Sequence, residues 1–206
     1  MSLRRNLLIW STVFLGFVTA LALDRIVYLY FYVQESAFQD WHRLFRVGGY
    51  LPYWLLVALA WMLIDGGVVK TQGIRRALAR GILLSTSVVS SGILAELLKI
   101  LIRRERPGLH DGYYYFRPWR EGPWDTAGLG LPSSHALVAF AATWTLCLLY
   151  PRAIPVWLLV GLGCGLSRLL DRAHFLSDVY LASVVSFLCV WLLWRWLADD
   201  LRPHRD

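Results

Sequence analysis

The sequence predicts an all-α protein embedded in a membrane. Of its 206 residues, 57% are hydrophobic, only 17% are charged and 11 are tryptophan. A soluble domain carries about 25% charged residues. The apolar residues gather in six runs, most of them near the roughly 20 residues that a helix needs to cross a bilayer. The length fits one domain, so we expect a single membrane domain over residues 1–206 with a motif-bearing core over 99–178.

The six runs predict six membrane-spanning helices. A signal peptide would be cleaved after Ala20-Leu21-Ala22, but the first run continues well past that site, which favours an uncleaved helix. Aromatic and charged residues mix over 34–49, which predicts a helix lying in the membrane interface, with His42 as an interfacial side chain. The predicted spans are 7–30, 50–65, 79–102, 133–150, 154–170 and 175–197.

Several function classes are disfavoured. The net charge of +7 comes from cations at the ends of apolar runs, as in membrane-flanking segments, so nucleic-acid binding is not expected. Three cysteines without a C-x-x-C spacing argue against disulfides and zinc. The glycines of Gly161-x-Gly163-x-Gly165 suit close helix packing better than a nucleotide loop, because no strand precedes them.

The third helix carries the first chemical motif, Lys99-x(6)-Arg106-Pro107. If the helix continues to Pro107, Lys99 and Arg106 lie on nearly the same side of it, about 10 Å apart along the axis. Glu96 shares that side and is placed to form an ion pair with Lys99. The motif therefore brings two cations to one end of the helix, where they are either membrane anchors or ligands of an anion.

The fourth helix opens with Leu131-Pro132-Ser133-Ser134-His135. Serine is a preferred N-cap, and the free N–H groups of a first helical turn form an anion site. In isolation, the same residues would also suit an ordinary helix cap with an incidental His135.

The last motif is Ser167-Arg168-x(5)-His174-x(3)-Asp178. Four residues apart on a helix, Asp178 can accept the proton of one ring nitrogen of His174, which leaves the other nitrogen as a nucleophile. Arg168 would not face the same side of a continuous helix, so we expect a break around residues 171–173.

An up-and-down path through six helices brings all three motifs to one face of the membrane. The numbers of Lys and Arg at the two faces are nearly equal. Setting aside Lys99, Arg106 and Arg168 leaves a modest excess on the side of the termini, where residues 70–80 are rich in basic side chains. We therefore expect a multi-pass protein of the plasma (bacterial inner) membrane, with the motifs on the extracytoplasmic face.

In this order, the three motifs resemble those of the type 2 phosphatidic acid phosphatases, a membrane branch of a superfamily that includes soluble acid phosphatases and vanadium haloperoxidases. The resemblance implies that His174 is the nucleophile, that Asp178 orients it, and that His135 protonates the leaving alcohol and later activates water. It implies no metal and no cofactor. The residues implied in phosphate binding are Lys99, Arg106, Ser133, Ser134 and Arg168. The family usually has glycine where this chain has Ser134, so the contact at that position is open.

The resemblance leaves the substrate open. The loop over residues 113–120 is rich in aromatic side chains and includes Arg117 and Arg120, which suit either an interfacial anchor or contact with an anionic headgroup. Candidates are undecaprenyl diphosphate, phosphatidylglycerol phosphate, phosphatidic acid and the phosphates of lipid A. A lipid-to-lipid phosphotransferase would share the motifs, and a non-catalytic transporter or scaffold is a remote alternative. The partners expected are the lipid phosphate and membrane lipids; the sequence does not indicate an oligomeric state.

Overall fold

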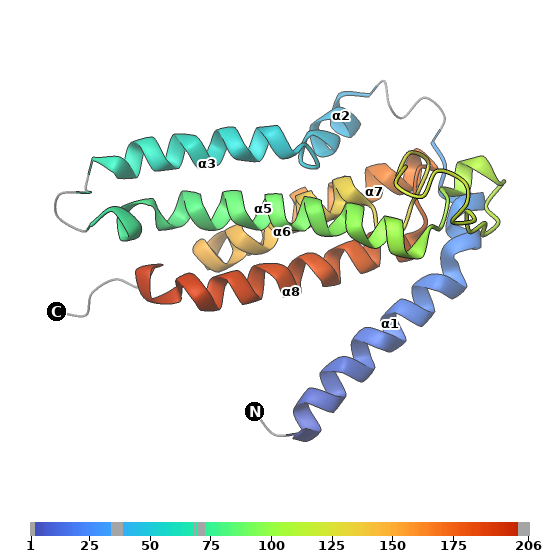
Figure 1. Ribbon diagram of the computed structural model, residues 1–206, viewed down its shortest axis with the longest axis horizontal. Helices are drawn as coiled ribbons and strands as arrows, with labels where there is room; N and C mark the ends of the chain where they lie inside the picture. The colour runs from blue at the N-terminus through green and yellow to red at the C-terminus, as the bar shows by residue number, and fades with distance from the viewer. Residues whose placement is uncertain (1–2, 34–38, 68, 70–72, 202–206) are drawn as a thin grey trace.

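The computed structural model describes residues 3–33, 39–67, 69 and 73–201. Within these residues the chain is helical and has no strand, apart from two isolated β-bridges in one loop. A helix matches each of the six predicted ranges (Figure 1). Residues 34–38 of the predicted interfacial segment and Lys70 of the basic cluster lie outside the described residues. The long helices are α1 (Leu3–Tyr30), α3 (Leu51–Gly66), α5 (Ile74–Ile102), α6 (Ser134–Leu149), α7 (Ile154–Leu170) and α8 (Leu176–Leu201), and the short ones are α2 (Asp40–Val47), η2 (Pro107–Leu109) and η3 (Pro151–Ala153).

Among the described residues, four helices are long and apolar enough to cross a membrane: Arg4–Tyr30, Ala77–Ile102, Pro151–Leu170 and Leu176–Leu197. Helices α2 and α3 pass the same test only as a pair, bent by 62°, and α6 is a shorter apolar helix. The described chain therefore has four membrane-spanning candidates, or five if the bent pair forms one span. Six spans remain a prediction.

Helix α6 forms the centre of the bundle and packs against α5, α7 and α8. Most of its side chains are buried, and small ones such as Ala136, Ala139 and Ala142 let the neighbouring helices approach closely. Larger residues of α6 fill the two hydrophobic clusters, Leu146 in one and Leu137 and Phe140 in the other. This packing places the first turn of α6 in the middle of one end of the bundle.

Helix α1 contacts α8 from the middle of α1 to its C-terminal part. The Tyr180 hydroxyl of α8 donates to the carbonyl of Val13 at 3.0 Å, and Gly16 leaves room for the Tyr180 ring. Toward the N-terminus, α1 diverges from the other helices (Figure 1). In the most apolar 18-residue stretch of α1, only 6% of the residues are buried. Asp24, by contrast, is almost fully buried.

Helix α5 ends at Ile102 and not at Pro107, so the prediction that Arg106 lies on this helix is wrong. The break comes at Arg103, which adopts a left-handed backbone conformation with φ 59°. Its side chain, 1% exposed, donates hydrogen bonds to the main-chain carbonyls of Arg117, Pro118, Glu121, Gly122 and Pro123. Arg103 thus organises the loop between α5 and α6 from the inside.

The structure also changes the interpretation of two residues outside the motifs, Arg117 and His42. Arg117 binds the Glu105 carboxylate at 2.6 Å within the loop, so its charge is not directed to an external headgroup. His42 is fully buried against Asp171 at 2.9 Å, so its prediction as an interfacial side chain is wrong. Helix α2 packs against α7, where Gly163 leaves the space that the Phe45 ring occupies.

Candidate active site

His174 lies in the break between α7 and α8, where the sequence predicted one, and Arg172 turns the chain with φ 53°. The Nδ1 atom of His174 lies 3.0 Å from the carbonyl oxygen of Gly130 and 3.3 Å from Oδ2 of Asp178. Since a carbonyl oxygen only accepts hydrogen bonds, the proton is placed on Nδ1, which donates it. Nε2 then keeps its lone pair, as a nucleophile requires.

The environment of His174 favours the neutral ring. Burial lowers the pKa of His174, and the nearby charges of Arg168 and Arg106 lower it further, while the hydrogen bond and charge of Asp178 act in the opposite direction. The net shift is downward, so the imidazole is unprotonated at neutral pH. A neutral ring with a free Nε2 is the reactive form of a histidine nucleophile.

Asp178 has more partners than the sequence indicated. Its carboxylate accepts from the main-chain N–H of Phe175 at 2.8 Å and from the Arg104 guanidinium at 2.6 Å. Its own carbonyl accepts from the N–H of Ser133 at 3.3 Å, which ties the start of α8 to that of α6. Arg104 and Gly130 were not predicted, because Arg104 is an unspecified position of the Lys99–Pro107 motif and Gly130 precedes the Leu131–His135 motif.

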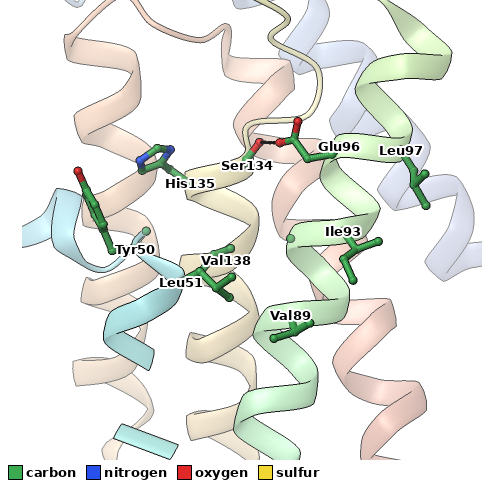
Figure 2. Close-up of a pocket in the computed structure, with 11 residues that line it drawn as sticks. Tyr50, Leu51, Val89, Ile93, Glu96, Leu97, Ser134, His135 and Val138 are labelled. Atoms are coloured by element: carbon green, nitrogen blue, oxygen red, sulfur yellow. Dashed lines mark hydrogen bonds between the residues drawn. The ribbon is translucent and has the colours of Figure 1, made fainter. Parts of the chain in front are cut away.

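The first turn of α6 has the predicted cap, in which Ser133 accepts from the N–H of Ala136 at 3.5 Å. Ser134 donates its hydroxyl to Oε1 of Glu96 at 2.6 Å, as Figure 2 shows. The same oxygen accepts from Lys99 at 2.8 Å, so the predicted Glu96–Lys99 ion pair is confirmed. Lys99 therefore joins the site through Glu96 and Ser134, and the serine that replaces the usual glycine binds this carboxylate.

Three guanidinium groups lie near enough to His135 to act on its charge, and two of them also act on His174. The charges of Arg168, Arg46 and Arg106 all act on His135, and Arg168 also contacts Asp171 at 3.2 Å. Within the described part of the chain, the buried Nε atoms of these three arginines have no hydrogen-bond partner. Guanidinium groups with unused donors are suited to bind phosphate oxygens. Arg46 comes from α2, and no motif pointed to it.

An apolar groove of about 580 Å³ begins at His135 and runs between α3, α5 and α6. Glu96, Ser134 and His135 line its polar end (Figure 2). The edge of the Tyr50 ring meets the His135 ring, with the centroids 5.6 Å apart. Gly49 permits this approach, since a Cβ there would lie 2.8 Å from that of His135. The apolar remainder of the groove is lined by Leu51, Val89, Gly92, Ile93, Leu97 and Val138.

Among the described residues, no group of three or more His, Cys, Asp or Glu side chains is placed to hold a metal ion. The positive charge of the site comes from Lys99 and the three arginines. Fixed cations and N–H groups of this kind can stabilise a phosphoryl group.

The family model of the PAP2 superfamily matches residues 80–202, which include all three motifs. The chain belongs to this superfamily. Two curated relatives of this PAP2 protein carry the name lipid A 1-phosphatase. The one from Rhizobium etli is 37% identical over 48% of this chain and 42% of its own length, and the one from Rhizobium johnstonii is 36% identical over 48% and 40%. The chain thus spans less than half the length of these relatives, and no solved structure matches it.

Proposed function

We propose that this PAP2 protein is an integral-membrane phosphatase that removes a phosphate group from a lipid through a phosphohistidine on His174. The observation that carries the proposal is the position of His135, which lines an open apolar groove and lies within the electrostatic influence of three guanidinium groups. The guanidinium groups suit a phosphate and the groove suits a hydrocarbon chain, so one molecule that carries both would place its phosphoester bond beside His135.

In the first step, Nε2 of His174 attacks the phosphorus and the bond to the lipid oxygen breaks. His135 gives its proton to the leaving oxygen, so the lipid departs as an alcohol. The phosphate dianion offsets the three guanidinium charges, which favours the protonated ring of His135 in the complex. Arg46, Arg106, Arg168 and Lys99 hold the phosphate oxygens, and the first turn of α6 after Ser133 offers N–H donors.

In the second step, His135 takes a proton from water, whose oxygen attacks the phosphorus. The P–N bond breaks, phosphate is released and the neutral ring of His174 is restored. Asp178 stabilises the positive charge that the His174 ring carries while it is phosphorylated. The fixed cations supply charge stabilisation in both steps, so we propose that the reaction needs no metal and no cofactor.

A lipid substrate fits the shape and the position of the groove. Ile93 and Leu97 line it and are exposed, so the groove opens sideways on the surface of apolar helices. A lipid could enter from the bilayer without leaving it. Lipid A 1-phosphate is the first candidate because two relatives carry that activity in their names. Undecaprenyl diphosphate, phosphatidylglycerol phosphate and phosphatidic acid are the alternatives.

We further propose that residues 1–206 form one membrane domain with six spans in the plasma membrane. Helix α6 would cross as a short helix in the protein interior, and α2 would lie at the interface beside the active site. This arrangement places the site on the extracytoplasmic face, with the basic 70–80 segment in the cytoplasm.

The deciding experiment measures phosphate release from the four lipid phosphates by the purified protein in detergent, with EDTA present and with His174→Ala as the control. We expect release by the wild type alone. Loss of activity in EDTA and its return with magnesium would contradict the metal-free mechanism. Adding an acceptor lipid to the assay separates the alternatives, because a phosphotransferase would yield a phosphorylated acceptor in place of free phosphate.

A further inference from the structure

Asp24 is a carboxylate inside the first membrane-spanning candidate, 1% exposed. It lies outside the matched family region, on a helix that is otherwise largely unburied. Burying an acidic side chain in a membrane helix is costly, and such residues usually serve a function. The contacts of Asp24 indicate which function this is.

Asp24 binds the beginning of α8 and the loop over the active site. It accepts from the main-chain N–H of Ser177 at 2.7 Å and from the Ser177 hydroxyl. The Tyr114 hydroxyl donates to it at 2.8 Å, and the Arg104 guanidinium lies 3.7 Å away. Three donors and one cation therefore converge on a carboxylate that is far from His174 in sequence.

Arg104 connects Asp24 to both partners of His174. Its guanidinium donates to Ser177 and to Asp178, each at 2.6 Å. Its carbonyl accepts from the N–H of Gly130 at 2.7 Å, and the Gly130 carbonyl accepts from His174. Arg104 is 2% exposed and lies between two carboxylates, so it cannot be screened by water.

We propose that Asp24 is a positioning residue for phosphoryl transfer, which shares the charge of Arg104 with Asp178 and so keeps the negative charge of Asp178 available to His174. This inference rests on the proposed function of His174. With a neutral His174, two carboxylates and one guanidinium leave the cluster with one net negative charge. Without the charge of Asp24, Asp178 would be fully neutralised by Arg104.

The test compares the kinetics of wild type and Asp24→Asn, which preserves the shape and removes the charge. We expect kcat to fall about tenfold or more and KM to stay within about twofold, because the charge acts on the transition state. We also expect the acidic limb of kcat/KM to move to lower pH, since His174 loses a compensating negative charge. The other groups facing His174 are the same in both proteins: Asp178 of α8, Arg168 of α7, His135 of α6 and Arg106 of the loop.

Two further variants separate positioning from simple anchoring of α1. Arg25→Gln is the matched control, because the neighbouring Arg25 is exposed and attaches α1 to Tyr113 of the loop; it should keep the wild-type pH profile. In an Arg104→Met background, Asp24→Asn should change kcat less than about twofold, because there is no charge left to share. An undiminished effect in that background would mean that Asp24 only anchors the helix.

If Asp24→Asn does not fold, Ser177→Ala decides, since the Ser177 hydroxyl accepts from Arg104 and donates to Asp24 and so holds the two charges together. A several-fold lower kcat at unchanged KM is expected, and wild-type kinetics would overturn the inference. The proposed function fails separately, if the wild type releases phosphate neither from the lipids nor from nitrophenyl phosphate. An active wild type with identical Asp24→Asn kinetics and pH profile would reject this inference alone.

Discussion

The amine of Lys99 lies 2.8 Å from the carboxylate of Glu96. A cation proposed to bind phosphate is thus already paired with an anion, and Glu96 also holds the Ser134 hydroxyl. We predict that Glu96→Gln tightens phosphate binding by about 2–10-fold, because Lys99 no longer has to exchange one anion for another. Inhibition by inorganic phosphate measures this. Ser134→Gly, which keeps the carboxylate, is the control, and weaker inhibition of Glu96→Gln would contradict the prediction.

The roles of His174 and His135 can be distinguished by changing the leaving group of the substrate. His174→Ala should abolish turnover and phosphoenzyme alike. His135→Ala should lose about 10²–10⁴-fold with an alcohol leaving group but recover partly with nitrophenyl phosphate, whose phenolate needs little protonation. Trapping of radiolabelled phosphate checks the nucleophile directly. If nitrophenyl phosphate restored the activity of both variants equally, or if His174→Ala still carried the phosphate label, the roles assigned to the two histidines would be wrong.

The pH dependence should report the environment of His174. Its pKa is lowered by burial, so the neutral ring persists below its ordinary value near 6.5 and the acidic limb of kcat/KM should lie below that value. Removing a nearby positive charge raises the pKa, and Arg168→Gln should therefore move this limb to higher pH, besides lowering kcat/KM. Dividing the kcat/KM profile of Arg168→Gln by that of the wild type removes the contribution of substrate ionisation, which is the same for both proteins. A limb that moves to lower pH in Arg168→Gln would exclude His174 as its source.

Gly92 should determine which hydrocarbon chains fit the groove. A Cβ at this position meets only Val138, at 3.8 Å, so a larger side chain would fill the groove without touching the backbone. We predict that Gly92→Leu raises KM for a long-chain lipid phosphate about tenfold and leaves hydrolysis of nitrophenyl phosphate unchanged. Gly66→Leu, at a helical glycine with open space outside the groove, is the matched control. Equal effects on both substrates would indicate misfolding or a different lipid site.

The orientation can be tested by cysteine labelling in intact cells. Trp124 is 78% exposed in the loop beside the active site, so Trp124→Cys should react with a membrane-impermeant reagent. Gly112 of the same loop is unsuitable, because a Cβ there would overlap the Tyr28 ring. Gly67→Cys, at the other end of α3, should be protected. Labelling at position 67 and protection at position 124 would invert the topology.

The sequence was sufficient for what depends on local pattern. Apolar runs located the helices, the serine cap located the start of α6, and the angular mismatch between Arg168 and His174 located a break. It failed where a distant contact decides the backbone. Pro107 looked like the end of α5, but Arg103 leaves the helix earlier because its side chain binds five loop carbonyls that no local pattern reveals.

The site residues divide in the same way. The pairing of Asp178 with His174 was predicted from their i,i+4 spacing, and it holds although His174 lies just before α8 and not on it. Arg104 and Arg46 were missed because each reaches the site only through tertiary packing, Arg46 by way of a helix fixed to α7 by His42. Asp24 did leave a signal in the sequence, because it is an acidic residue within an apolar run. Such a residue is expected to have a polar or charged partner, but the sequence does not show which one.

The five carbonyls that Arg103 binds belong to the main chain, so they remain whatever side chains occupy residues 117–123. The loop can therefore keep its main-chain conformation while its exposed side chains are substituted. Trp119 and Trp124 are exposed on it, at the end of the bundle where a lipid headgroup would lie. Related proteins would diverge in headgroup preference by exchanging exposed side chains such as Trp124, whereas the Trp119 ring also lies 5.0 Å from the Arg103 guanidinium. A directed-evolution library confined to the exposed positions would leave the proposed catalytic histidines unchanged.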